Sequence, residues 1–200
     1  QLQNRQQQGR DGVWLDLPTT TEQVQAALRQ IGISSDNPQS LFISGYFAEE
    51  EKRFAIPYNL VLASNVDELN FLAARLETLS AGERAELNAA LQTPQSELFS
   101  IGRITDFPEN VDYYVHLPDV HGPAQLGDYY LNRSGMVDMP DEWKGGIDTA
   151  QFGRYVAQQE QGAFTQYGYL VKSGDEWQKV HEGQPVPEEY RVLSFPASEI

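Results

Sequence analysis

The sequence lacks cysteine and holds only three histidines. Without cysteine there can be no disulfide bond and no thiolate metal site, which fits a reducing compartment. No apolar run approaches the roughly 18 residues of a membrane span. No charged and then apolar N-terminal stretch predicts a signal peptide. We therefore expect a cytoplasmic protein.

The motifs of common enzyme classes are also absent. No Gly-x-Ser-x-Gly elbow and no glycine-rich phosphate loop occurs, and no pair among the many carboxylates is marked for acid–base work. The most enzyme-like cluster is His116, Asp119 and His121, which could bind a catalytic divalent metal. Pro118 interrupts it, and no third block of ligands is evident. We expect no enzyme, no metal and no cofactor, and keep a metal-dependent hydrolase at these residues as the alternative.

Lysine is scarce, and the net charge is −15 with an isoelectric point near 4.4. Such a field repels nucleic acid and acidic membranes and attracts basic surfaces. From Ile104 to Trp143 a single base, Arg133, faces the acids Asp106, Glu109, Asp112, Asp119, Asp128, Asp138, Asp141 and Glu142. A merely solvated surface usually mixes the two signs. The pattern predicts a basic protein partner and neither nucleic acid nor membrane.

Length and an apolar content of 40% predict a folded protein with a substantial core. The order of expected elements favours an elongated α+β fold, with small α/β domains on either side of a short helical bundle. We expect an N-terminal α/β domain over residues 1–62, a helical domain over 63–105 and a C-terminal α/β domain over 106–200.

The first two segments have clear helical periods and weaker strand patterns. Residues 1–12 are glutamine-rich and predict a frayed end or a poorly specified strand. Spacing of apolar residues predicts helices from Thr19 to Ile31, from Val66 to Leu79, from Ala81 to Leu91 and from Glu97 to Ile104. Alternation predicts strands over Gly12–Leu17, Leu41–Phe47 and Phe54–Ile56.

In the third segment, strands and helices alternate. Asp148 stands where the N-cap of a helix over Thr149–Gln159 belongs, and Gly135 ends a helix over Leu126–Arg133. The loop from Met136 to Gly146 lies between these helices. Strands are expected over Val111–Leu117, Phe164–Val171 and Tyr190–Phe195. A hairpin is expected between Tyr167–Lys172 and Trp177–His181, around Gly174 and Asp175.

Three blocks of sequence resemble the ArdA antirestriction family, whose members mimic DNA. The first is Trp14–Pro18 with the helix that ends at Ile31–Ile33, and the second is the helix from Asp67 to Glu77. The third consists of Leu131, Gly135, Asp138, Pro140, Ile147, Asp148, Phe152, Gly153, Arg154, Gly168 and Tyr169. The blocks follow the family's order and span most of residues 13–171.

The resemblance implies a protein of mobile genetic elements that acts in a bacterial host. It would block a type I restriction–modification enzyme by occupying the DNA cleft of its specificity and methyltransferase subunits. The alternative is an inhibitor of another DNA-binding defence system, such as CRISPR or another nuclease. Candidate phosphate mimics are Asp138, Asp141, Glu142, Asp128 and Asp148, then Asp112, Asp119, Asp106 and Glu109.

A homodimer is expected on two grounds. Fifteen charges match about 25 Å of duplex at one charge per ~1.7 Å, which is short for a large cleft. A two-fold dimer would double that length, and the family resemblance also implies one, with the C-terminal domain as the interface. The apolar candidates for this contact are Leu131, Met136, Val137 and Met139.

Overall fold

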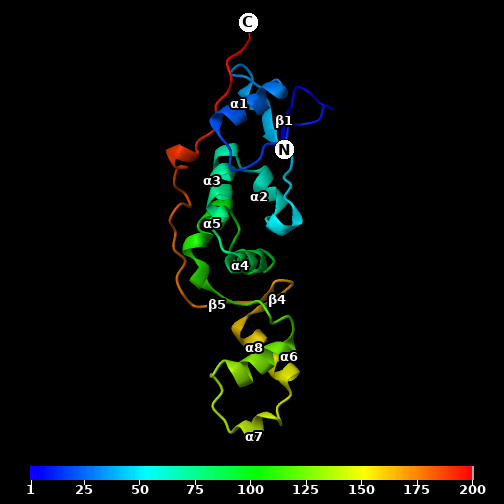
Figure 1. The fold of residues 1–200 in the computed structure, drawn as a ribbon, viewed down its shortest axis with the longest axis vertical. Helices are drawn as coiled ribbons and strands as arrows, with labels where there is room; N and C mark the ends of the chain where they lie inside the picture. Colours follow the sequence, from blue (N-terminus) through cyan, green and yellow to red (C-terminus); the bar gives the residue numbers. More distant parts are fainter. Residues whose placement is uncertain (200) are drawn as a thin grey trace. The chain divides into compact units, whose positions relative to one another are not determined.

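A computed structural model describes residues 1–199 of the chain. It has helices and two small antiparallel sheets, which confirms the expected mixed fold class. The chain forms two compact units (Figure 1). Unit 1 contains Gln1–Leu79, Leu98–Glu109 and the segment from Lys179 onward, and unit 2 contains Ser80–Glu97 and Asn110–Gln178. The domain boundaries placed at residues 62 and 105 stay predictions.

The N-terminus of unit 1 forms a short strand, which is the second of the two alternatives predicted for residues 1–12. Strand β1 (Leu2–Asn4) pairs antiparallel with β2 (Leu41–Ile43), and Leu2 lies opposite Ile43. Leu2 is only 4% exposed because it packs into an apolar core with residues of helix α1 (Thr21–Gln30). Burial of the Leu2 side chain therefore stabilises β1, although the glutamines around it predict little structure.

Helices of unit 1 begin where side-chain caps satisfy their first N–H groups. Thr20 forms a capping box with Gln23 at the start of α1, and Asn65 caps α3 (Val66–Glu77). Helix α5 (Ile101–Thr105) starts at the Ser100 cap, so the helix expected from Glu97 is shorter than predicted. A further helix, α2 (Tyr58–Leu62), lies outside the helices predicted from the sequence.

Several predicted strands are wrong. Within Gly12–Leu17 only Val13 forms a bridge, to Leu2, and Phe54–Ile56 is not a strand. Residues 173–199 hold one short helix, η6 (Glu188–Tyr190), and neither the predicted hairpin nor the strand over Tyr190–Phe195.

Polar side chains of α3 hold the C-terminal segment in place of a sheet. The Asp67 carboxylate accepts hydrogen bonds from the backbone N–H groups of Val192 and Leu193, both at 2.8 Å. Asn70 donates to the Tyr190 carbonyl at 3.0 Å. These bonds satisfy backbone groups that a strand would otherwise have paired. Val192, 5% exposed, then completes the core of unit 1.

Unit 2 is built on a three-stranded antiparallel sheet in the order β3-β5-β4. The strands are β3 (Tyr114–Leu117), β4 (Ala163–Thr165) and β5 (Gly168–Lys172). The strand predicted over Phe164–Val171 is thus two strands, and the one predicted from Val111 begins as a 3-10 turn, η4 (Val111–Tyr113). The sheet contacts helix α4 (Ala81–Leu91), and its central strand is buried from Gly168 to Val171.

Four helices complete unit 2. They are α6 (Pro123–Asp128), the π-helical turn η5 (Tyr129–Arg133), α7 (Asp141–Lys144) and α8 (Thr149–Glu160). The predicted helix over Leu126–Arg133 therefore starts earlier, at Pro123, and changes to π geometry. The predicted helix after the Asp148 cap is confirmed.

Helices α6 and α8 cross in direct backbone contact at two glycines (Figure 1). A Cβ on Gly127 would lie 1.9 Å from the Thr149 carbonyl oxygen, and a Cβ on Gly153 would lie 1.8 Å from the Pro123 carbonyl oxygen. Both distances are far below van der Waals contact. Only glycine fits at either position, which gives a physical reason for one of the residues in the third block.

Gly153→Ala is expected to destabilise the protein by roughly 3 kcal/mol. In an open helix the same change would stabilise by about 1 kcal/mol, so steric conflict determines the sign. Gly145→Ala is the control, since no atom lies within 4 Å of its built Cβ. Chemical unfolding followed by circular dichroism measures both. Equal stability of the two variants would contradict the packing argument.

Candidate partner-binding surface

Residues 136–148, here called the acidic segment, join the two crossing helices. Gly135, with φ of +71°, ends η5 and starts the segment, and Asp148 ends it by accepting a hydrogen bond from the Gln151 N–H at 3.1 Å. Four acids of the segment are exposed: Asp138, Asp141, Glu142 and Asp148. The α6–α8 crossing holds both ends of the segment in place, so these carboxylates lie on a loop whose ends are fixed.

Some of these carboxylates already have partners. Lys144 pairs with Asp141 at 3.2 Å, and Arg133 pairs with Asp128 at 3.8 Å. The Asn132 amide also donates to Asp128 at 2.8 Å. Among residues 1–199, neither Asp138 nor Glu142 has a hydrogen-bond or ion-pair partner. Exposed pairs of this kind add little stability, and the surface stays negative because its acids outnumber these two bases.

Asp119 and Asp128 lie together at a surface hollow. The hollow is lined by Asp119, Ala124, Gln125, Asp128 and Arg133. Asp119 follows the end of β3, and Asp128 is the last residue of α6. The structure therefore brings together two predicted mimics that are nine positions apart in the chain.

Asp112, on η4, is exposed and belongs to a second acidic group that sequence reasoning missed. Asp112 and Glu83 both lie near Glu86 of α4, which is only 9% exposed and has one carboxyl oxygen without a hydrogen-bond partner. Burial, and then the negative charges of Asp112 and Glu83, raise the pKa of Glu86 to about 8. Near neutral pH this carboxyl is protonated, so Glu86 adds no charge to the surface.

Glu86→Gln is expected to raise the free energy of unfolding by about 1–3 kcal/mol near pH 9 and to change it little near pH 5. The native carboxyl, with a pKa of about 8 against an ordinary 4.5, keeps a proton that the unfolded chain has lost. Wild-type stability therefore falls as pH rises from the unfolded to the folded pKa, and glutamine removes this loss. Urea unfolding at both pH values measures it, with Glu77→Gln as the exposed control. Parallel pH profiles for all three proteins would contradict it.

Asp106 does not belong to any surface, which corrects its place among the predicted mimics. It is fully buried, and its carboxylate accepts hydrogen bonds from the N–H groups of Val180, His181 and Glu182 at 2.7–3.1 Å. Its neighbour Glu109 is exposed but lies in unit 1 and forms an ion pair with Arg75. Both residues therefore stabilise unit 1.

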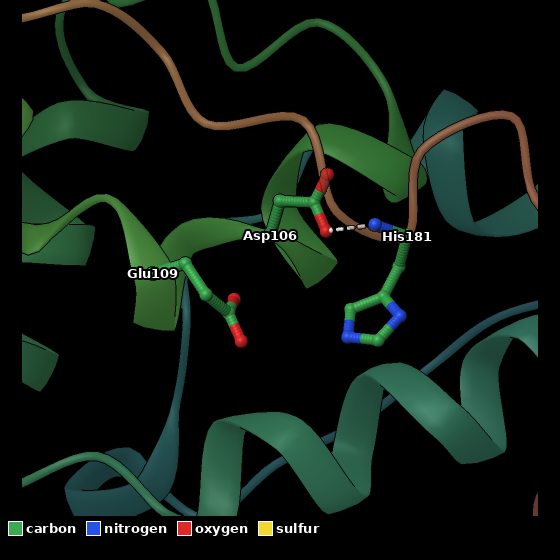
Figure 2. A group of neighbouring side chains, drawn as sticks. All are labelled: Asp106, Glu109 and His181. Atoms are coloured by element: carbon green, nitrogen blue, oxygen red, sulfur yellow. Dashed lines mark hydrogen bonds between the residues drawn. The ribbon is translucent and has the colours of Figure 1, made fainter.

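Asp106, Glu109 and His181 converge, as Figure 2 shows. One possible ligand atom from each lies within 4.8 Å of the other two, which makes them the single such group among residues 1–199. The existing bonds already use these groups, because three N–H donors surround Asp106 and the guanidinium of Arg75 neutralises Glu109. The His181 ring packs edge-on against Phe71, with 4.9 Å between the ring centroids. The two carboxylates therefore already have hydrogen-bond or ion-pair partners within unit 1.

The alternative metal site at His116, Asp119 and His121 is wrong in its geometry. Within the described residues these three do not form a convergent ligand group. The His116 Nε2 atom is hydrogen-bonded to the Tyr167 carbonyl at 2.7 Å across the sheet, and His121 is exposed. His116 lies on β3 and His121 lies in the segment after it, so residues that are close in sequence do not bring their ligand atoms together.

The four apolar candidates for a dimer contact differ in exposure. Leu131 is 3% exposed and packs inside unit 2, so it is not available for a contact. Val137 and Met139 are half-buried, and Met136 is 75% exposed. Trp143, at 66% exposure on α7, is a large exposed side chain that the sequence analysis did not single out.

A half-buried carboxylate between the helix and the sheet was also missed. Glu160 accepts hydrogen bonds from the hydroxyl groups of Tyr130 and Tyr169, which ties the end of α8 to η5 and β5. Burial, and then the bond to Glu160, raise the pKa of both tyrosines, so they stay protonated donors. A Cβ on Gly162 would overlap the Tyr169 ring, so glycine is required beside it.

Comparison with known families matches this architecture to one of them. The model of the antirestriction protein family ArdA matches residues 8–171, which include β4, nearly all of β5 and every helix from α1 to α8. The chain belongs to the ArdA family. A search of curated proteins finds no match to the chain. The resemblance drawn from three short blocks is thereby confirmed, and the C-terminal segment that Asp67 and Asp106 hold lies beyond the matched ArdA region.

Membership in ArdA makes this an antirestriction protein, whose interaction is with restriction–modification enzymes. Within the described part of the chain, no helix has the length and apolar character needed to cross a membrane.

Proposed function

We propose that this ArdA-family protein blocks a type I restriction–modification enzyme by mimicking B-form DNA. It acts without catalysis, in the cytoplasm of a bacterial host, and occupies the DNA cleft of the specificity and methyltransferase subunits. The observation that carries the proposal is the exposure of seven predicted mimics on one unit. They are Asp112, Asp119, Asp128, Asp138, Asp141, Glu142 and Asp148.

The charge arrangement supports a phosphate-like surface. Duplex DNA carries one negative charge per about 1.7 Å of its axis, and carboxylates one helical turn apart lie about 5–6 Å apart. Between Asn110 and Asp148 the two bases, Arg133 and Lys144, each pair with an acid. Neither Arg133 nor Lys144 therefore presents an isolated positive charge on this negative surface. A basic cleft would therefore gain by exchanging its counterions for this surface.

The triple variant Asp138→Asn, Asp141→Asn, Glu142→Gln is expected to weaken displacement of duplex DNA from a type I methyltransferase. We expect a loss of about 10- to 100-fold in affinity at low salt. The negative slope of log K against log salt should become less steep by about 2–3. Competition against a fluorescein-labelled duplex at about 50 and 200 mM salt measures both.

The matched control also removes three exposed acids, but from unit 1: Glu49, Glu50 and Glu51, each changed to glutamine. Its displacement should stay close to that of the wild-type protein. Equal losses for the two triple variants would show an effect of net charge alone. Failure of the wild-type protein to displace DNA at any salt would contradict the proposed function and direct attention to other DNA-binding defence systems.

We also propose that the protein acts as a homodimer. Two-fold pairing would double the charged length, and Met136 with its neighbours Val137 and Met139 offers apolar surface in unit 2. Leu131 is left out of this surface because it is buried.

Met136→Glu is expected to convert the dimer into a monomer, because it places a charge in an apolar contact. Light scattering coupled to size-exclusion chromatography gives the mass in solution. Asp175→Glu, an exposed conservative change in the same unit, serves as the control. A monomeric wild-type protein, or a dimeric Met136→Glu variant, would contradict the proposed interface.

A further inference from the structure

The acidic segment exposes one aromatic ring among its carboxylates. Trp143 lies on α7 directly after Asp141 and Glu142, and it is 66% exposed. The single cation of the segment, Lys144, is turned inward. Its side chain is 18% exposed and its ammonium lies 3.2 Å from Asp141, whose own side chain is 96% exposed. The exposed side chains of α7 are thus an indole and two carboxylates, and its one cation is largely covered.

This combination suits one kind of side chain. The face of tryptophan is the best aromatic partner for a cation, and arginine is the cation that most often stacks there. A guanidinium can lie flat on a ring while its N–H groups bond a carboxylate, whereas the compact lysine ammonium does both less well. Trp143 directly follows Glu142, so a stacking surface and a free carboxylate acceptor lie on the same turn of α7.

Other occupants fit this surface less well. A second copy seated on α7 would bring Asp141 and Glu142 against their own counterparts, and like charges repel, so the dimer contact proposed at Met136 does not extend to α7. Anionic lipid headgroups and nucleic acid carry the same sign as the segment. A surface that binds DNA phosphates is rich in arginine and lysine, so its charge complements that of α7.

We propose that Trp143 stacks on an arginine of the partner's DNA-binding surface and anchors α7 there, with the adjacent Glu142 as acceptor. This inference rests on the proposed function and specifies a chemistry that phosphates lack. A phosphate mimic gains affinity by release of counterions, which salt suppresses. A stacked contact releases none, so it holds affinity at salt concentrations where the mimicry alone would fail.

Substitutions that separate ring stacking from apolar area test the proposal. Trp143→Phe keeps a smaller aromatic face, Trp143→Leu keeps apolar area without a ring, and Trp143→Ala removes both. Trp14→Ala is the matched control, because Trp14 is 56% exposed and lies in unit 1. The readout is displacement of a labelled duplex from a purified type I methyltransferase at about 50 and 200 mM salt. Circular dichroism confirms that each variant is folded.

The expected result is a graded loss with an unchanged salt slope. Trp143→Ala and Trp143→Leu should each bind about tenfold more weakly at both salt concentrations, and Trp143→Phe within about threefold of wild type. Trp14→Ala should match the wild-type protein. The dependence of log K on log salt should become less steep only in the carboxylate variants.

Four outcomes would overturn the inference. Wild-type affinity of Trp143→Leu would show that apolar area, without stacking, makes the contact. Wild-type affinity of Trp143→Ala, while the wild-type protein displaces DNA, would remove Trp143 from the interface and leave the proposed function standing. A change in the solution mass of Trp143→Ala would assign the surface to a second copy. A wild-type protein that displaces no DNA would contradict the proposed function itself, and this inference with it.

Discussion

The backbone contact between α6 and α8 is the constraint on which the proposed surface depends. Gly127 and Gly153 let the two helices approach until carbonyl oxygens lie where side chains would begin. The acidic segment starts after η5, which continues α6, and ends at the cap of α8. Its carboxylates are therefore placed by a contact between residues that carry no charge. The bonds from Tyr130 and Tyr169 to Glu160 fix the far end of α8 in the same unit.

The acids behind the net charge of −15 have different physical roles. Asp67 and Asp106 are acceptors for backbone N–H groups of the C-terminal segment, and Glu160 is an acceptor for two tyrosines. Glu86 holds a proton because burial and two neighbouring acids favour its neutral form. The charge available to a partner is smaller than the formal number and lies mainly on exposed acids. A comparison with phosphates has to begin from that exposed set.

Local signals in the sequence were enough to predict part of this structure. Helices α3, α4 and α8 combine a clear apolar period with an Asn, Ser or Asp cap, and they fold as expected. The family blocks around Gly153 and Tyr169 also led to the correct family. The C-terminal segment could not be predicted, because its hydrogen bonds come from Asp67 and Asp106, more than 70 positions away in the chain. Alternation alone favoured a strand there.

The candidate site shows the same limit. Asp106 and Asp138 look alike as acids in one charge run, yet Asp106 is buried and Asp138 is exposed. Only the three N–H groups that surround Asp106 separate them, and these groups belong to a distant part of the chain. Leu131 and Trp143 show the converse error for apolar residues, since the one expected at an interface is buried and the one passed over is exposed.

A charge pattern and the duplex that it imitates share one source of affinity, because both gain it by displacing counterions and both lose it with salt. To exclude DNA from a cleft, a protein benefits from contacts that duplex DNA does not offer at its phosphates. Side chains supply them, since a carboxylate on a folded chain can stand beside an aromatic ring. The exposed indole of Trp143 and the inward-turned Lys144 place α7 in that position. Specificity for an arginine-lined cleft then follows from ring and carboxylate acting on the same guanidinium.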